Sequence, residues 1–286
     1  MINIAVFGAN GQLGQTIYSL VGEKNKGFRF FTSKEVDITQ KKDLDDVFRA
    51  NKFSYCINCA AYTNVEEAEK NKEKAFLVNS EGTKNVAEEC KKHNVVLIQI
   101  STDYVFDGAS KTPYKTTDLT NPINQYGKSK LQGEINISRI FKDYYIIRTS
   151  WLYSPFGKNF VKKIISKLKE NAELKITTQE IGTPTSCIDL SKFIIHITEK
   201  KDVPYGIYNF SAKGSATWYL FALEIAKILS PNKISNITPT DNYKTLAKRP
   251  KYSVFNIEKT EQEYKELKSW QKSLQEVINE IKKADL

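Results

Sequence analysis

Residues 2–15 read INIAVFGANGQLGQ, which is a short apolar run, a glycine-rich turn and the start of an amphipathic segment. Gly8, Gly11 and Gly14 have the spacing GxxGxxG. Glycines permit a tight turn and let a diphosphate approach the first amides of a helix, whose dipole favours an anion. A glycine turn can also be purely structural, but strand, turn and helix in this order favour a dinucleotide-binding site.

The same alternation of strand and helix continues to residue 150 and predicts the fold class. Strands are expected at 28–32, 55–61, 95–101 and 144–150, and helices at 12–22, 41–51, 74–94 and from Gln125 onward. Such alternation is typical of an α/β protein with a Rossmann-like, doubly wound parallel sheet.

The pattern becomes less regular after Trp151 and predicts a second, smaller unit. We expect residues 1–155 to form the dinucleotide-binding domain, with 187–212 returning to it. Residues 156–286 would form mainly a C-terminal α/β substrate lobe over the carboxyl edge of the sheet, where open α/β sheets bind ligands. Its expected elements are helices near 159–170, 188–199, 217–229 and 270–284 and strands at 174–177 and 206–211.

The composition limits the classes of partner. The formal net charge of +10 comes mostly from lysines spread along the whole chain, which is typical of a solvated surface and not of a nucleic-acid arm. The charge also suits a phosphorylated small molecule. No apolar run approaches the ~18 residues of a membrane span, and the start lacks the pattern of a signal peptide. We therefore expect a cytoplasmic protein without nucleic-acid or membrane partners.

One CxxC pair, Cys56 and Cys59, raises the question of a metal or redox site. The pair lies in an expected strand, where positions i and i+3 point to opposite faces. The sequence has no second such pair and two histidines. Reduced buried thiols are the favoured interpretation, with no metal site.

The end of the second expected strand bears on the choice of cofactor. An acidic residue there would bind the ribose 2′-hydroxyl of NADH, whereas this chain has Thr32, Ser33 and Lys34. Hydroxyls and a cation suit a 2′-phosphate, so NADPH is expected, with NADH as the alternative. Asp37 and Ile38 would cradle the adenine. The competing interpretation makes Lys34 one more surface lysine.

Tyr126 and Lys130 are four residues apart and share a face if the segment from Gln125 is helical. A nearby cation lowers the pKa of a phenol, so the pair could supply a proton, although such pairs also occur on solvated helices. The polar run Ser101, Thr102 and Asp103 follows the fourth strand, where it would face the ligand crevice and polarise a carbonyl. A capping turn is the alternative for this run.

Eight motifs in order resemble one family over almost the whole chain. They are GANGQLG, AAYTNVEEAE, ISTDYVFDG, PINQYGKSKLQGE, RTSWLYSPFGKNF, IGTPTS, SATWYLFA and KRPKYSVFNIEK. This set is similar to the dTDP-4-dehydrorhamnose reductases, which are extended short-chain dehydrogenase/reductases. The resemblance implies NADPH-dependent reduction of the C4 keto group of dTDP-4-dehydro-6-deoxy-L-mannose to dTDP-L-rhamnose, in nucleotide-sugar and cell-surface polysaccharide biosynthesis.

The resemblance also implies roles for individual residues. Tyr126 would be the general acid, Lys130 would lower its pKa and bind the nicotinamide ribose, and Thr102 would bind the substrate carbonyl. The implied cofactor positions, with Tyr126 and Lys130, are Gly8, Gly11, Gln12, Leu13, Gly14, Lys34, Asp37, Ile38, Ala60, Ala61, Tyr62 and Thr63. The implied substrate positions are Thr102, Asp103, Tyr104, Trp151, Asn159 and Arg249, although Trp151 could be a core residue and Arg249 a surface charge.

The chain departs from the family pattern at three places. Members that form a magnesium-bridged dimer carry a glutamate where this chain has Thr16, and its partner position is Ile188. We therefore expect a monomer or a homodimer without such a bridge. Gln179 with Glu180 replaces a usual Asp-Gln pair, and Lys248 replaces an arginine, which removes bidentate geometry.

Three other functions compete with this interpretation. The chain could reduce another nucleotide-linked 4-keto-6-deoxy sugar, such as a UDP-linked one. It could be a non-catalytic NADP-binding regulatory subunit, or an epimerase that retains NAD. The complete set of Thr102, Tyr126 and Lys130 favours an enzyme, because a binding subunit would not need all three.

Overall fold

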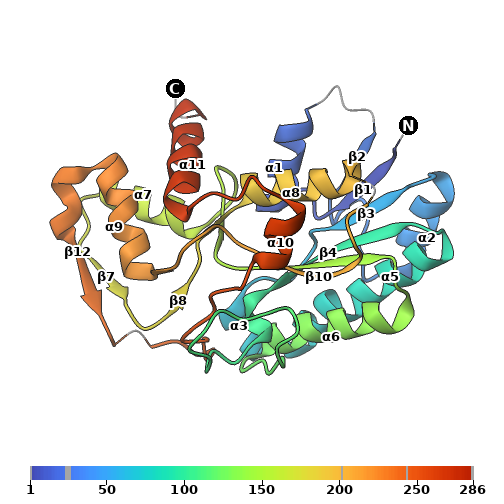
Figure 1. Cartoon of the computed structure of the whole chain (residues 1–286), viewed down its shortest axis with the longest axis horizontal. Helices are drawn as coiled ribbons and strands as arrows, with labels where there is room; N and C mark the ends of the chain where they lie inside the picture. The colour runs from blue at the N-terminus through green and yellow to red at the C-terminus, as the bar shows by residue number, and fades with distance from the viewer. Residues whose placement is uncertain (1, 23–26, 201, 243, 285–286) are drawn as a thin grey trace.

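The computed structural model describes residues 2–22, 27–200, 202–242 and 244–284. Its centre is a parallel sheet with the strand order β10-β5-β4-β3-β1-β2 (Figure 1). The strands are β1 (Ile4–Phe7), β2 (Phe28–Phe31), β3 (Tyr55–Asn58), β4 (Val96–Thr102), β5 (Tyr144–Thr149) and β10 (Gly206–Phe210). The order reverses between β1 and β3, so the carboxyl ends of these two strands flank the switch point at which such sheets bind ligands.

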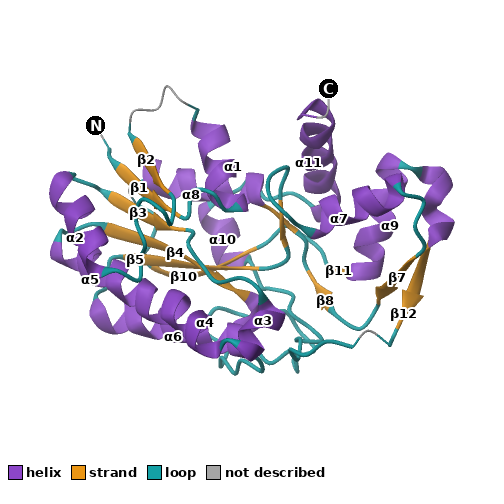
Figure 2. Cartoon of the chain, turned by 180° about the vertical axis from the view of Figure 1, so that it is seen from behind, coloured by secondary structure: helices purple, strands orange, loops and turns teal. Residues whose placement is uncertain are grey.

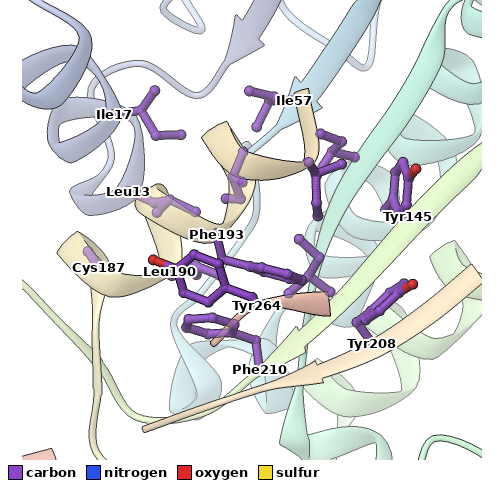
Figure 3. Close-up of a cluster of buried hydrophobic side chains, with 14 of the residues drawn as sticks. Leu13, Ile17, Ile57, Tyr145, Cys187, Leu190, Phe193, Tyr208, Phe210 and Tyr264 are labelled. Atoms are coloured by element: carbon purple, nitrogen blue, oxygen red, sulfur yellow. The ribbon is translucent and has the colours of Figure 1, made fainter. Parts of the chain in front are cut away.

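Helices cover both faces of the sheet, which confirms the predicted doubly wound α/β class (Figure 2). One face carries α1 (Gln12–Val21), α8 (Cys187–Glu199) and α10 (Glu258–Glu263), and the other carries α2 (Lys41–Ala50), α5 (Thr83–Lys92) and α6 (Gln125–Ile140). Each face has its own apolar core. Figure 3 shows the first, where Leu13 and Ile17 of α1 meet Leu190 and Phe193 of α8.

The two cysteines of the CxxC pair lie on opposite faces of the sheet, as the strand period predicts. Cys56 belongs to the core beneath α2 and α5, whereas Cys59 packs against the core beneath α1 and α8. All four cysteines are free thiols.

The segment before β4 differs from the single helix expected at 74–94. It consists of α3 (Val65–Lys70), α4 (Lys72–Phe76), a π-helix η1 (Leu77–Gly82) and then α5. The side chain of Asn64 caps α3 by accepting from the amide of Glu67 at 3.1 Å. This cap, followed by acidic residues in the first turn, is a start signal that could have predicted α3.

The C-terminal lobe is built around a short parallel pair, β7 (Leu174–Thr177) and β12 (Ile237–Thr240). An apolar cluster joins this pair to α7 (Phe160–Lys169), α9 (Trp218–Leu229) and α11 (Trp270–Ala284). The sequence did not predict β12 or α10. The remaining short elements are β6 (Leu152–Tyr153), β8 (Ile181–Gly182), β9 (Thr185–Ser186), β11 (Ala216–Thr217), η2 (Asp103–Val105) and η3 (Pro231–Asn236).

Within the described residues, no helix combines the length and apolar character that a membrane crossing needs.

Candidate active site

The glycine turn lies at the switch point, and two of its glycines are required by packing. Gly8 has φ +80°, and a Cβ there would come within 2.6 Å of the amide nitrogen of Ala60. A Cβ on Gly14 would lie 2.5 Å from the carbonyl oxygen of Gly8. Gly11 is different, because within the described part of the chain a Cβ there would meet only that same oxygen, at 3.2 Å. The space beside Gly11 is therefore open for a ligand to approach the backbone.

The first turn of α1 offers backbone amides and not side chains to an anion. Among the residues that the structure describes, no side chain caps this helix at Gly11, and no acidic residue lies in its first turn. Leu13 is buried in the core, and Gln12 Oε1 accepts a hydrogen bond from Ser154 Oγ at 3.3 Å. The uncapped amides and the helix dipole favour a diphosphate at this end.

The end of β2 carries a carboxylate that the sequence interpretation overlooked. The amide and the hydroxyl of Thr32 both donate to Glu35 Oε2, each at 2.8 Å. Lys34 is exposed between them in the sequence. A 2′-phosphate at this place would meet Lys34 and the hydroxyl of Thr32, which already donates to the carboxylate of Glu35. The T-x-x-E spacing is the signal that could have identified Glu35.

Asp37 and Ile38 have structural contacts in this segment. Asp37 Oδ1 accepts from the amide and the hydroxyl of Thr39, each at 2.9 Å. Ile38 is buried, and its side chain lies against Gly82 of the π-helix. Their predicted contact with adenine stays a prediction.

The loop of residues 60–63 follows β3 and is held by hydrogen bonds with Asn79. The sequence did not single out Asn79. Asn79 Oδ1 accepts from the amide of Tyr62 at 2.8 Å, and Asn79 Nδ2 donates to the Tyr62 carbonyl at 3.0 Å. Asn79 Nδ2 also donates to Ser129 Oγ at 2.9 Å, and Ser129 Oγ donates to the Tyr126 carbonyl at 2.8 Å. The buried amide thus connects the expected cofactor loop to the helix of Tyr126.

Tyr126 and Thr102 come together at the end of β4. Asn124 caps α6 by accepting from the amide of Gly127 at 2.8 Å, which places Tyr126 in the first turn. Burial raises the pKa of Tyr126 to about 12, a hydrogen bond with Thr102 lowers it, and the charge of Asp103 raises it. At neutral pH the phenol therefore keeps its proton and can act as an acid.

Lys130 lies one turn further along α6 and is buried. Its ammonium group donates to the carbonyl of Ile100 at 2.7 Å. Burial lowers the pKa of Lys130 to about 8, while the carboxylate of Glu134 opposes this change. Burial is the largest cause of the Tyr126 shift and raises the pKa, and Lys130 is not among the causes of that shift; the expected lowering of the Tyr126 pKa by Lys130 is therefore not seen in this structure.

A buried ion pair supports this part of α6. Arg148 Nη2 and Nε donate to the two oxygens of Glu134 at 2.7 and 3.1 Å. Ser101 Oγ donates to the same carboxylate at 2.5 Å. Ser101, expected to polarise a carbonyl, therefore has a hydrogen-bond partner beneath the site, whereas Thr102 lies next to Tyr126.

Asp103 orients the hydroxyl of Thr102. Thr102 Oγ1 donates to Asp103 Oδ1 at 3.1 Å and accepts from the amide of Tyr104 at 3.2 Å. Burial raises the pKa of Asp103 to about 6, and the hydroxyls of Ser253 and Thr102 oppose the shift. The ring of Tyr104 meets the ring of Tyr126 edge-on, with centroids 5.8 Å apart.

Trp151 adopts a backbone conformation that is rare for a bulky side chain. Its φ is +47°, in the left-handed region. The indole stacks on Trp218 with ring centroids 3.7 Å apart and planes 6° apart. A Cβ on Gly182 would lie 2.6 Å from the indole. Residues held in sparsely populated backbone regions cluster at functional sites, so this geometry makes Trp151 a candidate for ligand contact.

A cavity of about 270 Å³ opens beside these aromatic rings in the C-terminal lobe. Its walls combine apolar and aromatic side chains with four basic residues. The lining residues are Phe160, Lys163, Ile164, Lys167, Leu174, Lys175, Ile176, Thr177, Glu180, Trp218 and Arg249. Aromatic faces together with cations suit a nucleotide, whose base is flat and whose phosphates are anionic.

Arg249 reaches this cavity with its guanidinium held on one side. Its Nη2 pairs with Glu66 Oε1 at 3.0 Å, while its buried Nε has no hydrogen-bond partner among the described residues. Asn159 is different, because its amide donates to the carbonyl of Ser154 at 2.9 Å and accepts from the amide of Lys162 at 3.1 Å. Asn159 therefore caps α7, and its predicted contact with substrate stays a prediction.

The positions expected to lack a metal bridge have ordinary structural contacts. Thr16 Oγ1 donates to the carbonyl of Gln12 at 2.7 Å, and Ile188 packs against the apolar cluster of the C-terminal lobe. Among the described residues, no group of three or more His, Cys, Asp or Glu side chains could hold a metal ion.

Comparisons with known proteins agree over nearly the full chain. The sequence model of the RmlD substrate binding domain matches residues 2–283. The dTDP-4-dehydrorhamnose reductase of Aggregatibacter actinomycetemcomitans is 35% identical, with 97% of this chain and 98% of that protein covered. A dTDP-4-dehydrorhamnose reductase crystal structure from Clostridium acetobutylicum is 37% identical and superposes with a TM-score of 0.92, over 98% of this chain and 100% of that one. The Bacillus anthracis reductase, solved in complex with NADP, is 34% identical with the same TM-score and coverage.

Proposed function

The chain belongs to the family of the RmlD substrate binding domain, and from this membership we propose that it reduces the C4 keto group of dTDP-4-dehydrorhamnose to give dTDP-L-rhamnose. The family membership confirms the resemblance read from the eight motifs. One observation of geometry carries the proposal: Thr102 and Tyr126 meet at the end of β4, the strand beside β3. The chain also has a basic, aromatic cavity that suits a nucleotide.

The residues around the glycine turn fit NADPH. The open backbone at Gly11 and the uncapped amides of α1 suit the diphosphate, and Lys34 suits a 2′-phosphate. The similar Bacillus anthracis reductase was solved with NADP. When bound, NADPH supplies the hydride that reduces C4. Lys130, buried and one turn beyond Tyr126, would bind the ribose of the cofactor, and residues 60–63 would line the same site.

Tyr126 would deliver the proton. Reduction develops negative charge on the C4 oxygen, and a positioned donor stabilises that charge. The phenol keeps its proton at neutral pH because burial raises the pKa of Tyr126 to about 12. The Thr102 hydroxyl, fixed between Asp103 and the amide of Tyr104, is the second group available at that oxygen.

The C-terminal lobe would bind the nucleotide sugar. Arg249 and the lysines of the cavity suit the diphosphate, and Trp218, which lines the cavity and stacks on Trp151, offers an aromatic face to the base or the sugar. We further propose that the enzyme acts in the cytoplasm as a monomer or a homodimer without a magnesium bridge. The apolar or hydroxyl side chains at Ile188 and Thr16 support the last point.

The decisive test is the fall in NADPH absorbance when the pure protein meets enzymatically generated dTDP-4-dehydrorhamnose, repeated with NADH. We expect oxidation with dTDP-L-rhamnose as product. Tyr126→Phe should lose at least about 100-fold of kcat and still bind cofactor, because general acid catalysis contributes roughly that much. Tyr205→Phe, at an exposed tyrosine, is the matched control. Full activity of Tyr126→Phe would refute the proposed role, and oxidation only with a UDP-linked keto sugar would refute the substrate.

A further inference from the structure

The helix α3 brings one carboxylate against a distant segment of the chain. Its cap, Asn64, directly follows the loop Ala60–Thr63, so the first turn of α3 lies next to the expected cofactor loop. Glu66 in that turn contacts residues 246–249, which are about 180 positions away in the sequence. We call residues 246–249 the strap.

Both oxygens of Glu66 are committed to the strap. Oε1 pairs with Nη2 of Arg249 at 3.0 Å, and Oε2 accepts from the amides of Leu246 and Ala247 at 2.8 and 3.4 Å. Burial raises the pKa of Glu66, but the hydrogen bonds from Arg249 and the two amides outweigh burial, so the pKa is lowered overall. At neutral pH this side chain is therefore an anion bound by three donors.

A second contact holds the strap to the catalytic helix. Asn124, the cap of α6, donates to the carbonyl of Lys248 at 2.8 Å while its Oδ1 accepts from the amide of Gly127. The strap is thus anchored from two sides, at α3 and at the turn that carries Tyr126. Arg249 is the last residue of this doubly anchored strap.

Arg249 itself lines the cavity and has one buried donor without a partner among the described residues. Its side chain lines the cavity and is mostly buried, and its Nε has no hydrogen-bond partner among the described residues. An unpaired buried N–H is rare and costly. An anionic oxygen in the cavity would satisfy it, and a guanidinium held by one edge can present its other edge to a phosphate.

We propose that Glu66 is a positioning residue that holds Arg249 and the strap in the orientation that binds the diphosphate of the nucleotide sugar. The inference rests on the proposed function for the identity of the ligand. Glu66 does not touch the reacting atoms. It acts through Arg249, because its carboxylate meets the guanidinium and two amides of the strap.

The first test is Glu66→Gln, which keeps the shape and removes the charge. The KM for the nucleotide sugar and the Kd for dTDP, measured by calorimetry, should each rise about tenfold, which corresponds to the ~1.4 kcal/mol expected for a weakened charged hydrogen bond. The kcat and the KM for NADPH should stay within about twofold. Glu73→Gln, on the exposed face of neighbouring α4, is the matched control and should leave all four constants unchanged.

The second test separates positioning from a general structural role. In an Arg249→Met background, Glu66→Gln should change the Kd for dTDP by less than about twofold, because its target is gone. Full additivity of the two substitutions would overturn the proposal. So would a tenfold loss of kcat or of NADPH affinity in Glu66→Gln.

The outcomes also distinguish this inference from the proposed function. Wild-type turnover of dTDP-4-dehydrorhamnose with no effect of Glu66→Gln on KM or on the Kd for dTDP overturns the inference alone. Binding of dTDP that depends on Glu66, without turnover of the keto sugar, supports the inference and overturns the proposed reaction. Failure of the wild type to bind dTDP overturns the inference.

Discussion

At the scale of single residues, burial sets the protonation of the candidate catalytic groups more strongly than their neighbours do. It raises the pKa of Tyr126 to about 12 and of Asp103 to about 6, and it lowers the pKa of Lys130 to about 8. The i, i+4 spacing singled out Tyr126 and Lys130 from the sequence as candidates. The direction of the Tyr126 shift could not be read there, because burial belongs to the tertiary structure.

The low pKa of Lys130 predicts an alkaline limit for cofactor capture. As the pH rises through about 8 the ammonium loses its proton, so kcat/KM for NADPH should fall. Tyr126 remains protonated over this range and does not contribute to the fall in kcat/KM. The predicted fall can be measured as a pH profile of kcat/KM for NADPH. The Lys130→Arg variant retains its charge, so its kcat/KM should show no fall at pH values below about 10, because a guanidinium titrates above ~12. The same fall in kcat/KM near pH 8 in that variant would contradict the assignment of the fall to Lys130.

The buried carboxyl of Asp103 predicts a stability cost. Its folded pKa of about 6 exceeds the usual 3.8, so the folded state retains a proton that the unfolded state releases, and stability falls as the pH rises through this window. At pH 7 the cost is about 3 kcal/mol, since each pKa unit is worth ~1.4 kcal/mol.

Asp103→Asn should therefore raise the free energy of unfolding at pH 7, and the gain should shrink by roughly half at pH 5. Urea denaturation at the two values of pH measures the difference. An equal gain at both would show that the charge of Asp103 is not its source.

At the scale of elements, the π-helix η1 is the least predictable part of the site. Its residues lie within a pattern that indicated one continuous helix, yet the π turn puts Asn79 between Tyr62 and Ser129. Single π turns inside helices are frequent at functional sites. The three contacts join residues that are 17 and 50 positions apart, so no local spacing encodes them.

Asn79→Ala should affect the cofactor as well as stability. It leaves the amide of Tyr62 without its acceptor, which should cost about 1–3 kcal/mol in unfolding free energy and raise the KM for NADPH several-fold. Asn136→Ala is the control, because Asn136 donates to Ser80 of the same π-helix and does not touch the loop. It should lose stability alone. Equal KM values in the two variants would contradict a role of Asn79 in holding the loop.

At the scale of the whole molecule, two regions of the chain carry different chemistry. The sheet supplies hydroxyl, phenol and ammonium groups at its carboxyl edge, and the C-terminal lobe supplies cations and aromatic rings. Of the cavity lysines, Lys167 is paired with Glu170 at 2.7 Å, whereas Lys163 and Lys175 are exposed. The net charge of +10 adds a general attraction for anions.

This charge distribution predicts a salt-sensitive KM. Raising NaCl from about 50 to about 500 mM should increase the KM for the nucleotide sugar several-fold and leave kcat unchanged, because screening shortens the range of the attraction. The double variant Lys163→Gln/Lys175→Gln should flatten the dependence. Lys91→Gln/Lys282→Gln, at exposed positions that do not line the cavity, is the control with the same change in net charge. The same dependence of KM on salt in the two variants would show that Lys163 and Lys175 are not the source of the attraction.

The sequence by itself determined the parallel α/β fold, the glycine turn at its first strand, the faces of Cys56 and Cys59 and the position of Tyr126 and Lys130 one turn apart on α6. These features follow from backbone sterics and from periods of a few residues, which act locally. Only the tertiary structure decided the burial that sets the pKa of Asp103 and the attachment of Glu66 to Arg249. Both depend on how segments as far as about 180 residues apart pack together, and no short-range pattern records that packing.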